Sequence, residues 1–366
     1  MKFLFVCPTI DNYVSGPYWS VYGLITGLLN NGHDVVLITT SKKNVYNISD
    51  IYTILAEKSN KFKLIILRNE EFIPFDFSFS FFKCLFFIGK VDYISIQSPF
   101  LISGWLAFLV AKLRSIPCSI SIRGEFLNFK NLRKPSKKYS LFFIKFVLNN
   151  VSQIHYLNDK EIRVLKYLGV NNSSFYIPNG CHFVVNRNLK RQRIFLYLGR
   201  IIKEKNIINL IKAWRQSSTL DYKLLLVGNL DINFKDELLS VKGFDDSILV
   251  LPEVYGVEKS NLLISSEWII LPSLREGMPM SILEAISHGV LSIISHECNL
   301  QEFVQNECSL LTGTTVDSIS KAIDTAIKLE DARKNLNREK SYDLIQKNYL
   351  WDDIAKRFIS EARKVL

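Results

Sequence analysis

The chain has 366 residues, of which 48% are hydrophobic, and its formal net charge is +11. This length predicts two domains, and the apolar content is sufficient for two buried cores. The six cysteines form no C-x-x-C pair and have no histidine partner at zinc spacing, which argues against a zinc site and favours a reducing cytosol. The opening segment, Lys2–Pro8, is too short for a signal peptide and is typical of a first strand.

The positive charge is concentrated in the first half of the chain. Residues 1–180 hold 21 Lys and Arg against 11 Asp and Glu, whereas residues 181–366 hold 25 against 24. A basic half indicates an anionic partner, either nucleic acid or an anionic membrane surface. The sequence has neither an RNA-binding aromatic signature nor a helix-turn-helix pattern. We therefore predict a membrane surface as the partner, and no nucleic acid.

Apolar runs alternate with helical patterns in the first half. The first strand is followed by a polar loop ending in Ser15-Gly16 and by a helix, and this order predicts a parallel sheet. Asn158 and Glu161 have the spacing of a capping box at the start of another helix. Strands are expected at 3–7, 34–39, 63–67, 93–97, 118–122 and 151–156.

Two segments of the first half could contact a membrane. Residues 72–87 are rich in phenylalanine and indicate either a packed core helix or a membrane-facing lip. Residues 130–148 begin with a basic cluster and continue as an apolar helix, which is either a core helix or one lying on anionic lipid. The charge asymmetry favours the membrane for the second segment. Neither segment has the roughly 20 apolar residues of a membrane span.

The second half repeats the alternation, with strands expected at 194–198, 223–227, 248–251, 268–271 and 290–295. Gly199-Arg200 follows the first of these strands, and Lys205 lies five residues further on. An arginine fork and a lysine charge at a strand-to-helix turn can neutralise a diphosphate, although a solvated basic loop is the alternative. The sequence has no G-x-G-x-x-G fingerprint, which argues against a nicotinamide enzyme.

Residues 271–289 predict a strand, a short loop and a helix that has Pro279 in its first turn. The start of a helix suits a pyrophosphate, and Gly277 allows a ligand to approach the backbone closely. Glu276 in the loop could accept hydrogen bonds from sugar hydroxyls, and Glu284 in the helix could hold a ribose. Two solvated surface glutamates are the alternative interpretation.

The stretch Glu276-Gly-Met-Pro-Met-Ser-Ile-Leu-Glu284-Ala resembles the E-x7-E motif of glycosyltransferase family 4. Gly199-Arg200 with Lys205 resembles the phosphate clamp of that family. The segment from Gly16 to the G-H-x-V pattern at residues 32–35 resembles its N-terminal pattern, with Ser15 in place of the first glycine.

The resemblance implies a GT-B fold of class α/β, in which two Rossmann-like domains with parallel sheets face a central cleft. Residues 1–176 would bind the acceptor and residues 177–350 the nucleotide sugar, while a C-terminal helix at 351–366 would cross back onto the first domain. It also implies a retaining hexosyltransferase with a nucleoside-diphosphate sugar, most often UDP-linked, as donor. No metal or other cofactor is expected, because the sequence has no D-x-D motif.

The resemblance also implies roles for individual residues. Arg200, Lys205 and Glu276 would be catalytic. Arg123, which stands where many relatives have histidine, and Glu125 would meet the donor or the acceptor. The donor contacts would be Gly16, Gly199, Gly277, Met278, Pro279, Met280 and Glu284.

The implied acceptor is a lipid-linked saccharide at the inner face of the membrane, as in the assembly of bacterial surface polysaccharide and lipopolysaccharide. The protein would then be cytoplasmic and peripherally attached to that membrane. Two alternatives stay open, a GT-B sugar-nucleotide epimerase or hydrolase and a non-catalytic nucleotide-sugar-binding protein.

Overall fold

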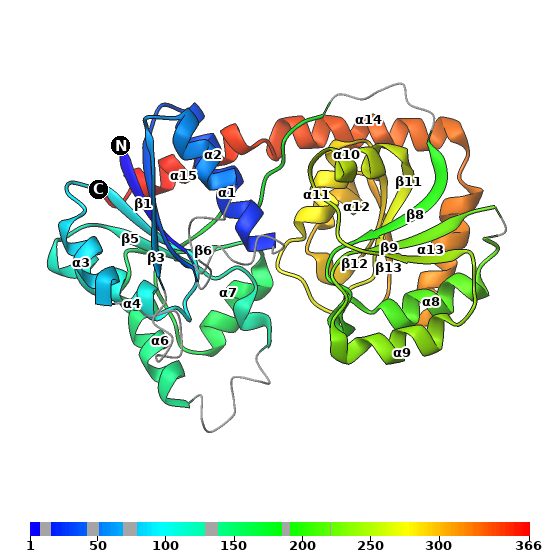
Figure 1. Ribbon diagram of the computed structural model, residues 1–366, viewed down its shortest axis with the longest axis horizontal. Helices are drawn as coiled ribbons and strands as arrows, with labels where there is room; N and C mark the ends of the chain where they lie inside the picture. The colour runs from blue at the N-terminus through cyan, green and yellow to red at the C-terminus, as the bar shows by residue number, and fades with distance from the viewer. Residues whose placement is uncertain (8–15, 42–50, 69–78, 129–137, 185–190, 220) are drawn as a thin grey trace. The chain divides into compact units, whose positions relative to one another are not determined.

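The computed structural model describes residues 1–7, 16–41, 51–68, 79–128, 138–184, 191–219 and 221–366 (Figure 1). The chain forms two compact units. The first contains Met1–Gly180 and Trp351–Leu366, and the second contains Cys181–Leu350. Each unit is built on one parallel sheet with helices between its strands, so the α/β class is confirmed. Within the described ranges, no helix is long and apolar enough to cross a membrane.

The first unit has a seven-stranded sheet with the order β3-β2-β1-β4-β5-β6-β7. Its central strand β1 pairs with β2 on one side and β4 on the other, with Leu4 opposite both Val36 and Ile94. All six expected strands are present, and only the short β7 was not anticipated. The strands are β1 (Lys2–Val6), β2 (Asp34–Ser41), β3 (Phe62–Arg68), β4 (Tyr93–Ile96), β5 (Cys118–Ser121), β6 (Gln153–Tyr156) and β7 (Ser174–Tyr176).

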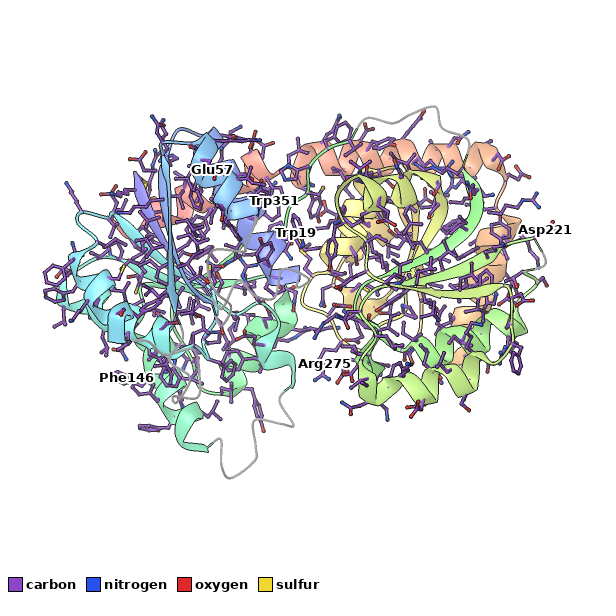
Figure 2. The ribbon with its side chains drawn as sticks, viewed as in Figure 1. Trp19, Glu57, Phe146, Asp221, Arg275 and Trp351 are labelled. Carbon is purple, nitrogen blue, oxygen red and sulfur yellow. The ribbon has the colours of Figure 1, made fainter. Side chains whose placement is uncertain are left out.

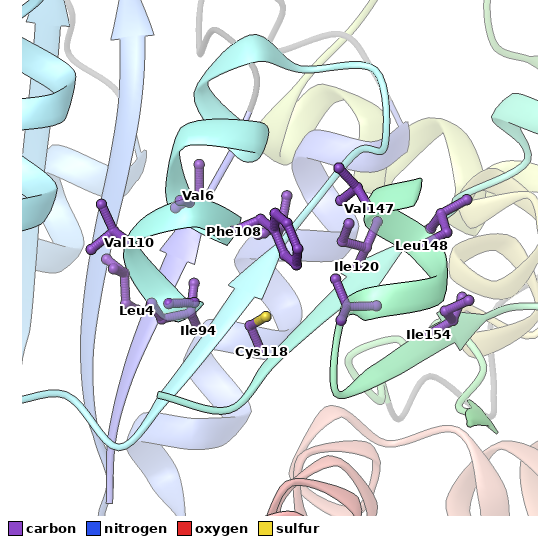
Figure 3. Packing of buried hydrophobic residues seen from close by; sticks show 14 of the residues in the cluster. Leu4, Val6, Ile94, Phe108, Val110, Cys118, Ile120, Val147, Leu148 and Ile154 are labelled. Atoms are coloured by element: carbon purple, nitrogen blue, oxygen red, sulfur yellow. The ribbon is translucent and has the colours of Figure 1, made fainter. Parts of the chain in front are cut away.

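Helices cover this sheet. The helices of the first unit are α1 (Gly16–Asn30), α2 (Ile51–Lys58), α3 (Phe79–Phe87), α4 (Ile102–Leu113), the 3-10 turn η2 (Glu125–Asn128), α6 (Lys138–Asn150), α7 (Asp159–Tyr167) and α15 (Trp351–Arg363). Buried side chains of α3, α4 and α6, among them Phe108 and Val147, pack against Leu4, Ile94 and Ile120 of the strands (Figure 3). The phenylalanine-rich segment is therefore partly core, because Phe81 of α3 is fully buried.

The C-terminal helix α15 packs against α1 in the first unit, as the resemblance implied. Phe358 of α15 is fully buried, and its ring lies 6.0 Å from the ring of Phe3 and 5.9 Å from that of Tyr93. Gly27 of α1 lies so close to the backbone of Trp351 that a Cβ atom there would collide with it. Trp351 is marked in Figure 2. The last helix of the chain is thus part of the first unit's core.

The second unit has a six-stranded sheet with the order β10-β9-β8-β11-β12-β13. The five expected strands are present, and β13 is an addition. The strands are β8 (Gln192–Leu198), β9 (Lys223–Val227), β10 (Ile248–Leu251), β11 (Ser266–Leu271), β12 (Leu291–Ser295) and β13 (Ser309–Thr312). The helices are η4 (Lys203–Lys205), α8 (Ile207–Gln216), α9 (Ile232–Lys242), α10 (Gly256–Ser265), α11 (Met280–Ser287), η5 (His296–Cys298), α12 (Gln301–Gln305), α13 (Val316–Lys328) and α14 (Asp331–Asn348).

Candidate active site

The strand order of the second unit defines where a ligand would bind. After β8 the chain adds β9 and β10 on one side, and it then returns to place β11, β12 and β13 on the other side. The loops after β8 and β11 therefore diverge at the carboxyl edge of the sheet, which is the switch point where open α/β sheets bind ligands. The loop after β8 carries Gly199 and Arg200, and the loop after β11 carries Glu276.

Two glycines allow the backbones to meet at this edge. The amide of Gly199 donates to the carbonyl of Val227 over 3.0 Å. Gly228, at a φ of 149°, lies so close to Gly199 that a Cβ atom would collide with the Gly199 carbonyl oxygen. A side chain at position 228 would therefore force the two loops apart, and glycine keeps the carboxyl ends of β8 and β9 tightly joined.

Lys205 and Glu276 form an ion pair, Nζ to Oε1. Their side chains are only 18% and 10% exposed. The hydroxyl of Ser273 also donates to Glu276 Oε1 over 2.7 Å. The fold thus brings together two residues that are 71 positions apart in the sequence. Both belong to the set that the sequence predicted, and a charge pair with so little water around it is strongly coupled.

Arg200 directly follows Gly199 and is exposed. Its carbonyl accepts a hydrogen bond from the phenol of the buried Tyr197, with an O–O distance of 2.5 Å. Burial raises the pKa of Tyr197 well above its usual value, and the nearby Glu276 carboxylate raises it further. Tyr197 therefore stays neutral beneath this loop and supports its backbone.

Two asparagines hold the loops in place. The Asn206 side chain donates to the carbonyls of Pro272 and Thr314, over 3.1 and 2.8 Å. The Asn299 side chain donates to the carbonyls of Glu276 and Gly277, over 2.8 and 2.9 Å. Both asparagines have left-handed backbone conformations, with φ of 62° and 56°, which asparagine tolerates better than most residues.

The helix after this loop begins one residue later than predicted. Pro279 is the N-cap of α11, with an extended conformation (φ −72°, ψ 118°), and Met280 is the first helical residue. Proline fits this position because an N-cap residue has non-helical ψ and its own N–H is not needed there. Met278 and Pro279 are buried, whereas Gly277 and Met280 are partly exposed.

Glu284 lies on α11 and forms an ion pair with Lys259 of α10, with 2.7 Å between Oε1 and Nζ. Neither glutamate of the motif is thus a fully solvated surface residue, and each has a lysine partner. The thiol of Cys298 lies buried near the same loop. Burial raises its pKa to about 12, and the Glu276 carboxylate contributes to this shift. This cysteine is therefore protonated at neutral pH.

The first unit carries a second polar cluster, at the carboxyl end of β5. Arg123 has a left-handed backbone, with φ of 46°, which costs a non-glycine residue about 1 kcal/mol. Its Nε and Nη2 donate to Gln97 Oε1 over 2.9 and 2.6 Å, and its Nη1 donates to the Ser20 hydroxyl over 2.5 Å. Three of its five N–H groups are therefore used within the unit, and the prediction of a substrate contact stays untested.

Two carboxylates lie beside Arg123. Glu125 is exposed and accepts from the Ser98 hydroxyl over 2.7 Å. Glu161 is fully buried, and it accepts from the amides of Gly124 and Leu157. The Asn158 cap is confirmed, since its side chain accepts from the Glu161 amide. The capping box is only half formed, however, because the Glu161 carboxylate joins α7 to the loop after β5 instead.

For some predicted residues, the neighbouring segments or the residues themselves lie outside the described part of the structure. Gly16 is the exposed first residue of α1, but Ser15 and the loop before it lie outside the described residues. The same holds for residues 130–137, which contain most of the basic cluster, and for the first part of the phenylalanine-rich segment.

Four residues that contact the predicted site residues or their loops were not predicted from the sequence: Asn206, Ser273, Asn299 and Lys259. Asn206 directly follows the predicted clamp lysine, and Ser273 lies in the predicted loop, so both had a weak positional signal. Lys259 and Asn299 belong to other elements of the fold, and the sequence around each of them did not indicate a contact with the site.

Residues 182–341 match the family model described as "Glycosyl transferases group 1". Among curated relatives, a capsular polysaccharide biosynthesis glycosyltransferase, CapH, of Staphylococcus aureus is 22% identical over 68% of this chain and 73% of its own length. An N,N'-diacetylbacillosaminyl-diphospho-undecaprenol alpha-1,3-N-acetylgalactosaminyltransferase of Campylobacter jejuni is 26% identical over 78% of this chain and 81% of its own.

Among solved structures, Anabaena Alr3699/HepE in complex with UDP and glucose covers 100% of both chains with a TM-score of 0.78 and 13% identity. This likeness supports the GT-B type of fold. The family match spans nearly all of the second unit and includes Arg200, Lys205 and both glutamates of the motif. The second unit therefore matches the Glycosyl transferases group 1 model over most of its length, and the relatives of the chain include a glycosyltransferase of capsular polysaccharide biosynthesis.

Proposed function

We propose that the protein is a retaining glycosyltransferase. It would move a hexosyl or N-acetylhexosaminyl group from a nucleoside-diphosphate sugar to a hydroxyl of a lipid-linked or growing surface saccharide. The observation that carries this proposal is the meeting of Lys205 and Glu276 at the switch point of a Glycosyl transferases group 1 domain. A cation beside a hydroxyl-binding carboxylate suits a substrate in which a sugar is joined to a diphosphate.

The charges suit the departure of a diphosphate. When the bond between the sugar carbon and the phosphate oxygen breaks, negative charge develops on the diphosphate, and fixed cations stabilise it. Lys205 has three N–H donors, so it can hold Glu276 and a phosphate oxygen together. Arg200 and the start of α11 would share the charge, with no metal ion needed. Glu276 would orient the donor sugar, and Glu284 the ribose.

Retention fits a same-face attack, in which the leaving phosphate takes the proton of the acceptor hydroxyl. The side chains near Glu276 are consistent with this mechanism. The Cys298 thiol and the Tyr197 phenol both have raised pKa values and are poor nucleophiles at neutral pH. We therefore expect no covalent glycosyl-enzyme intermediate on either side chain.

Two similar proteins guide the choice of substrates. The Anabaena structure binds UDP and glucose, which favours UDP as the donor nucleotide. The name of the Campylobacter relative describes transfer to a diphospho-undecaprenol saccharide, which favours a lipid-linked acceptor. The first unit would take this acceptor, with Arg123 and Glu125 near it and Gly16 near the donor phosphates. The cleft expected between the two units stays a prediction.

A lipid-linked acceptor calls for a membrane contact, and we propose that α3, α4 and α6 provide it at the inner membrane face. Trp105 of α4 and Phe143 of α6 have ring centroids 4.8 Å apart, and α3 packs on α4 (Figure 1). Six large apolar side chains on these helices are exposed. They are Phe86, Phe87, Leu109, Leu113, Phe142 and Phe146, which we call the apolar patch.

The apolar patch has a basic surround. Lys83, Lys112 and Lys145 are exposed on the same three helices. Phe146 is marked on α6 in Figure 2. Apolar side chains that enter the lipid boundary, with lysines that meet anionic headgroups, favour binding in the plane of an anionic membrane.

The decisive experiment measures donor turnover for a panel of nucleotide sugars, with and without a membrane extract that supplies acceptors. A glycosyltransferase consumes its donor only with the extract and releases the free nucleoside diphosphate. An epimerase or hydrolase acts without it, and a binding protein never turns over donor. Either of those two patterns would overturn the proposal.

The same assay tests the clamp. We expect Lys205→Ala to lower turnover by about two orders of magnitude or more, because a cation beside the developing charge is lost. Lys203→Ala is the matched control, since Lys203 lies exposed in the same 3-10 turn, η4. Near-normal turnover by Lys205→Ala would remove the clamp from the mechanism.

A further inference from the structure

Lys259 and Glu284 connect α10 to α11. The Lys259 ammonium lies 2.7 Å from Glu284 Oε1, and the two side chains are 17% and 31% exposed. A second contact lies nearby, because the Ser260 hydroxyl of α10 is 3.2 Å from Nε2 of His288, the C-cap residue of α11. The lysine side chain is therefore mostly enclosed and is ion-paired to a residue of α11.

The geometry restricts the carboxylate of Glu284. A solvated glutamate turns freely about three side-chain bonds, and binding a ligand would have to arrest that motion. Lys259 contacts Oε1, which restricts the motion of the carboxylate, and a carboxylate has acceptor sites on both of its oxygens for further donors. A vicinal diol such as that of a ribose needs acceptors whose position is already set. The ion pair provides this before the ligand arrives.

The neighbouring backbone supports the orientation. The carbonyl of Glu284 accepts from the Ser287 hydroxyl over 2.7 Å and lies 2.8 Å from His288 Nδ1. The last turn of α11 is thus fixed by its own side chains, and the Glu284 carboxylate by a residue of another helix.

We infer that Lys259 is a positioning residue, which holds Glu284 ready to bind the ribose hydroxyls of the donor nucleotide. This inference rests on the proposed function, in which Glu284 binds the ribose. It adds a residue that lies outside the E-x7-E motif and outside the phosphate clamp. A purely structural role, as a link between α10 and α11, is the competing explanation.

The test measures nucleotide binding by calorimetry, with UDP and 2'-deoxy-UDP as probes. For Lys259→Met we expect UDP to bind about tenfold more weakly, as is typical when a charge-assisted contact that orders a binding group is lost. For 2'-deoxy-UDP, which lacks a hydroxyl to be bound, the same variant should change affinity by less than about twofold to threefold. Lys259→Arg should recover part of the UDP affinity, because it keeps the charge.

Ser260→Ala is the matched control, because it removes the neighbouring contact between α10 and His288 and leaves the Lys259–Glu284 pair in place. A purely structural Lys259 predicts equal losses for both nucleotides, or a loss for Ser260→Ala as large as that for Lys259→Met. Either result would overturn the inference, as would unchanged UDP binding by Lys259→Met.

Turnover separates this inference from the proposed function. In the donor assay, Lys259→Met should raise KM for the donor by about the same factor and leave kcat within about twofold, because a contact present in both ground and transition states is weakened. If the wild-type protein binds UDP with the expected pattern but transfers no sugar, the proposed function fails and the positioning role stands. If the wild type transfers sugar but the variant binds both nucleotides normally, only the positioning role fails.

Discussion

At the scale of single residues, the closest coupling in the candidate site is that of Lys205 with Glu276. Each is mostly withdrawn from water, so the attraction between the two charges is only weakly screened. A buried pair of this kind adds little net stability compared with apolar side chains, but removing one partner leaves an uncompensated charge. The pair therefore affects stability as well as the proposed catalysis, which a phosphate clamp predicted from the sequence alone does not.

This coupling gives a prediction about stability. Lys205→Met and Glu276→Gln should each lower the free energy of unfolding by about 2 kcal/mol, because one strands a carboxylate and the other an ammonium. The double variant should lose less than the sum of the two, with a coupling energy of about 1–3 kcal/mol. Denaturant titration of the wild type, the two single variants and the double variant measures this coupling energy. Strictly additive losses would show that the two groups do not interact in solution.

At the scale of elements, two short helical segments set the site. The turn η4 presents Lys205, and α11 begins beyond Glu276. Asparagine side chains hold both segments, because Asn206 donates to the Pro272 carbonyl and Asn299 donates to the Glu276 carbonyl. The amide of Leu274 also donates to the Glu204 carbonyl over 2.9 Å, which ties the loop after β11 directly to η4. The site is thus held by backbone contacts as well as by its charges.

The apolar patch allows a prediction at the same scale. The wild-type protein should sediment with phosphatidylglycerol vesicles and not with phosphatidylcholine vesicles, and added salt should weaken this binding. Phe87→Ser with Phe142→Ser should reduce binding about tenfold or more, because the two rings are 80% and 77% exposed and free to enter lipid. Phe244→Ser is the control, because this fully exposed ring lies in the second unit. Equal loss in the control would place the membrane contact elsewhere.

At the scale of the whole molecule, the first unit is completed by the end of the chain. Its core includes Phe358, which lies among aromatic rings from β1, β4, β6 and β7. The second unit is inserted between the two parts of the first, since residues 181–350 interrupt it. Folding of the first unit therefore depends on residues that are synthesised after the whole of the second unit.

This arrangement predicts where a core substitution acts. Phe358→Ala should destabilise the first unit by about 3–5 kcal/mol, the usual loss for a large aromatic side chain in a core. Hydrogen exchange should show faster exchange in β1, β4 and β6, while β8 to β13 keep their protection. Phe244→Ala, at a surface position, should leave both units unchanged. A uniform loss of protection in both units would show that they unfold as one.

Much of this architecture could be predicted from the sequence, because local patterns encode it. The strands around Leu4 and Leu225 are continuous apolar runs, as is typical of buried parallel strands. Their alternation with helices allowed few topologies. The short strands β7 and β13 were not anticipated, because the three residues of β7 and the two leucines of β13 carry little periodic signal.

The site was predictable to the extent that its residues lie near one another in the sequence. Glu276, Gly277 and Glu284 share one motif, and Gly199, Arg200 and Lys205 share another. The two motifs were expected to meet, because both follow strands that end at the same edge of a parallel sheet. The ion pair between Lys205 and Glu276 could not be predicted, because side-chain pairing depends on how the two loops pack. Glu161 is the clearest example. Its spacing from Asn158 predicted a capping box, but its carboxylate accepts a hydrogen bond from Gly124 in the loop after β5 instead.

The sequence by itself determined the class of fold, the position of the two motifs and the basic character of the first half, because these follow from composition and local spacing. Only the tertiary structure decided which charges became partners. Lys259 reaches Glu284, Arg123 is engaged by Gln97 and Ser20, and Asn299 supports the Glu276 loop. Each of these contacts joins residues far apart along the chain. Such pairs are set by packing geometry, for which a linear pattern carries no signal.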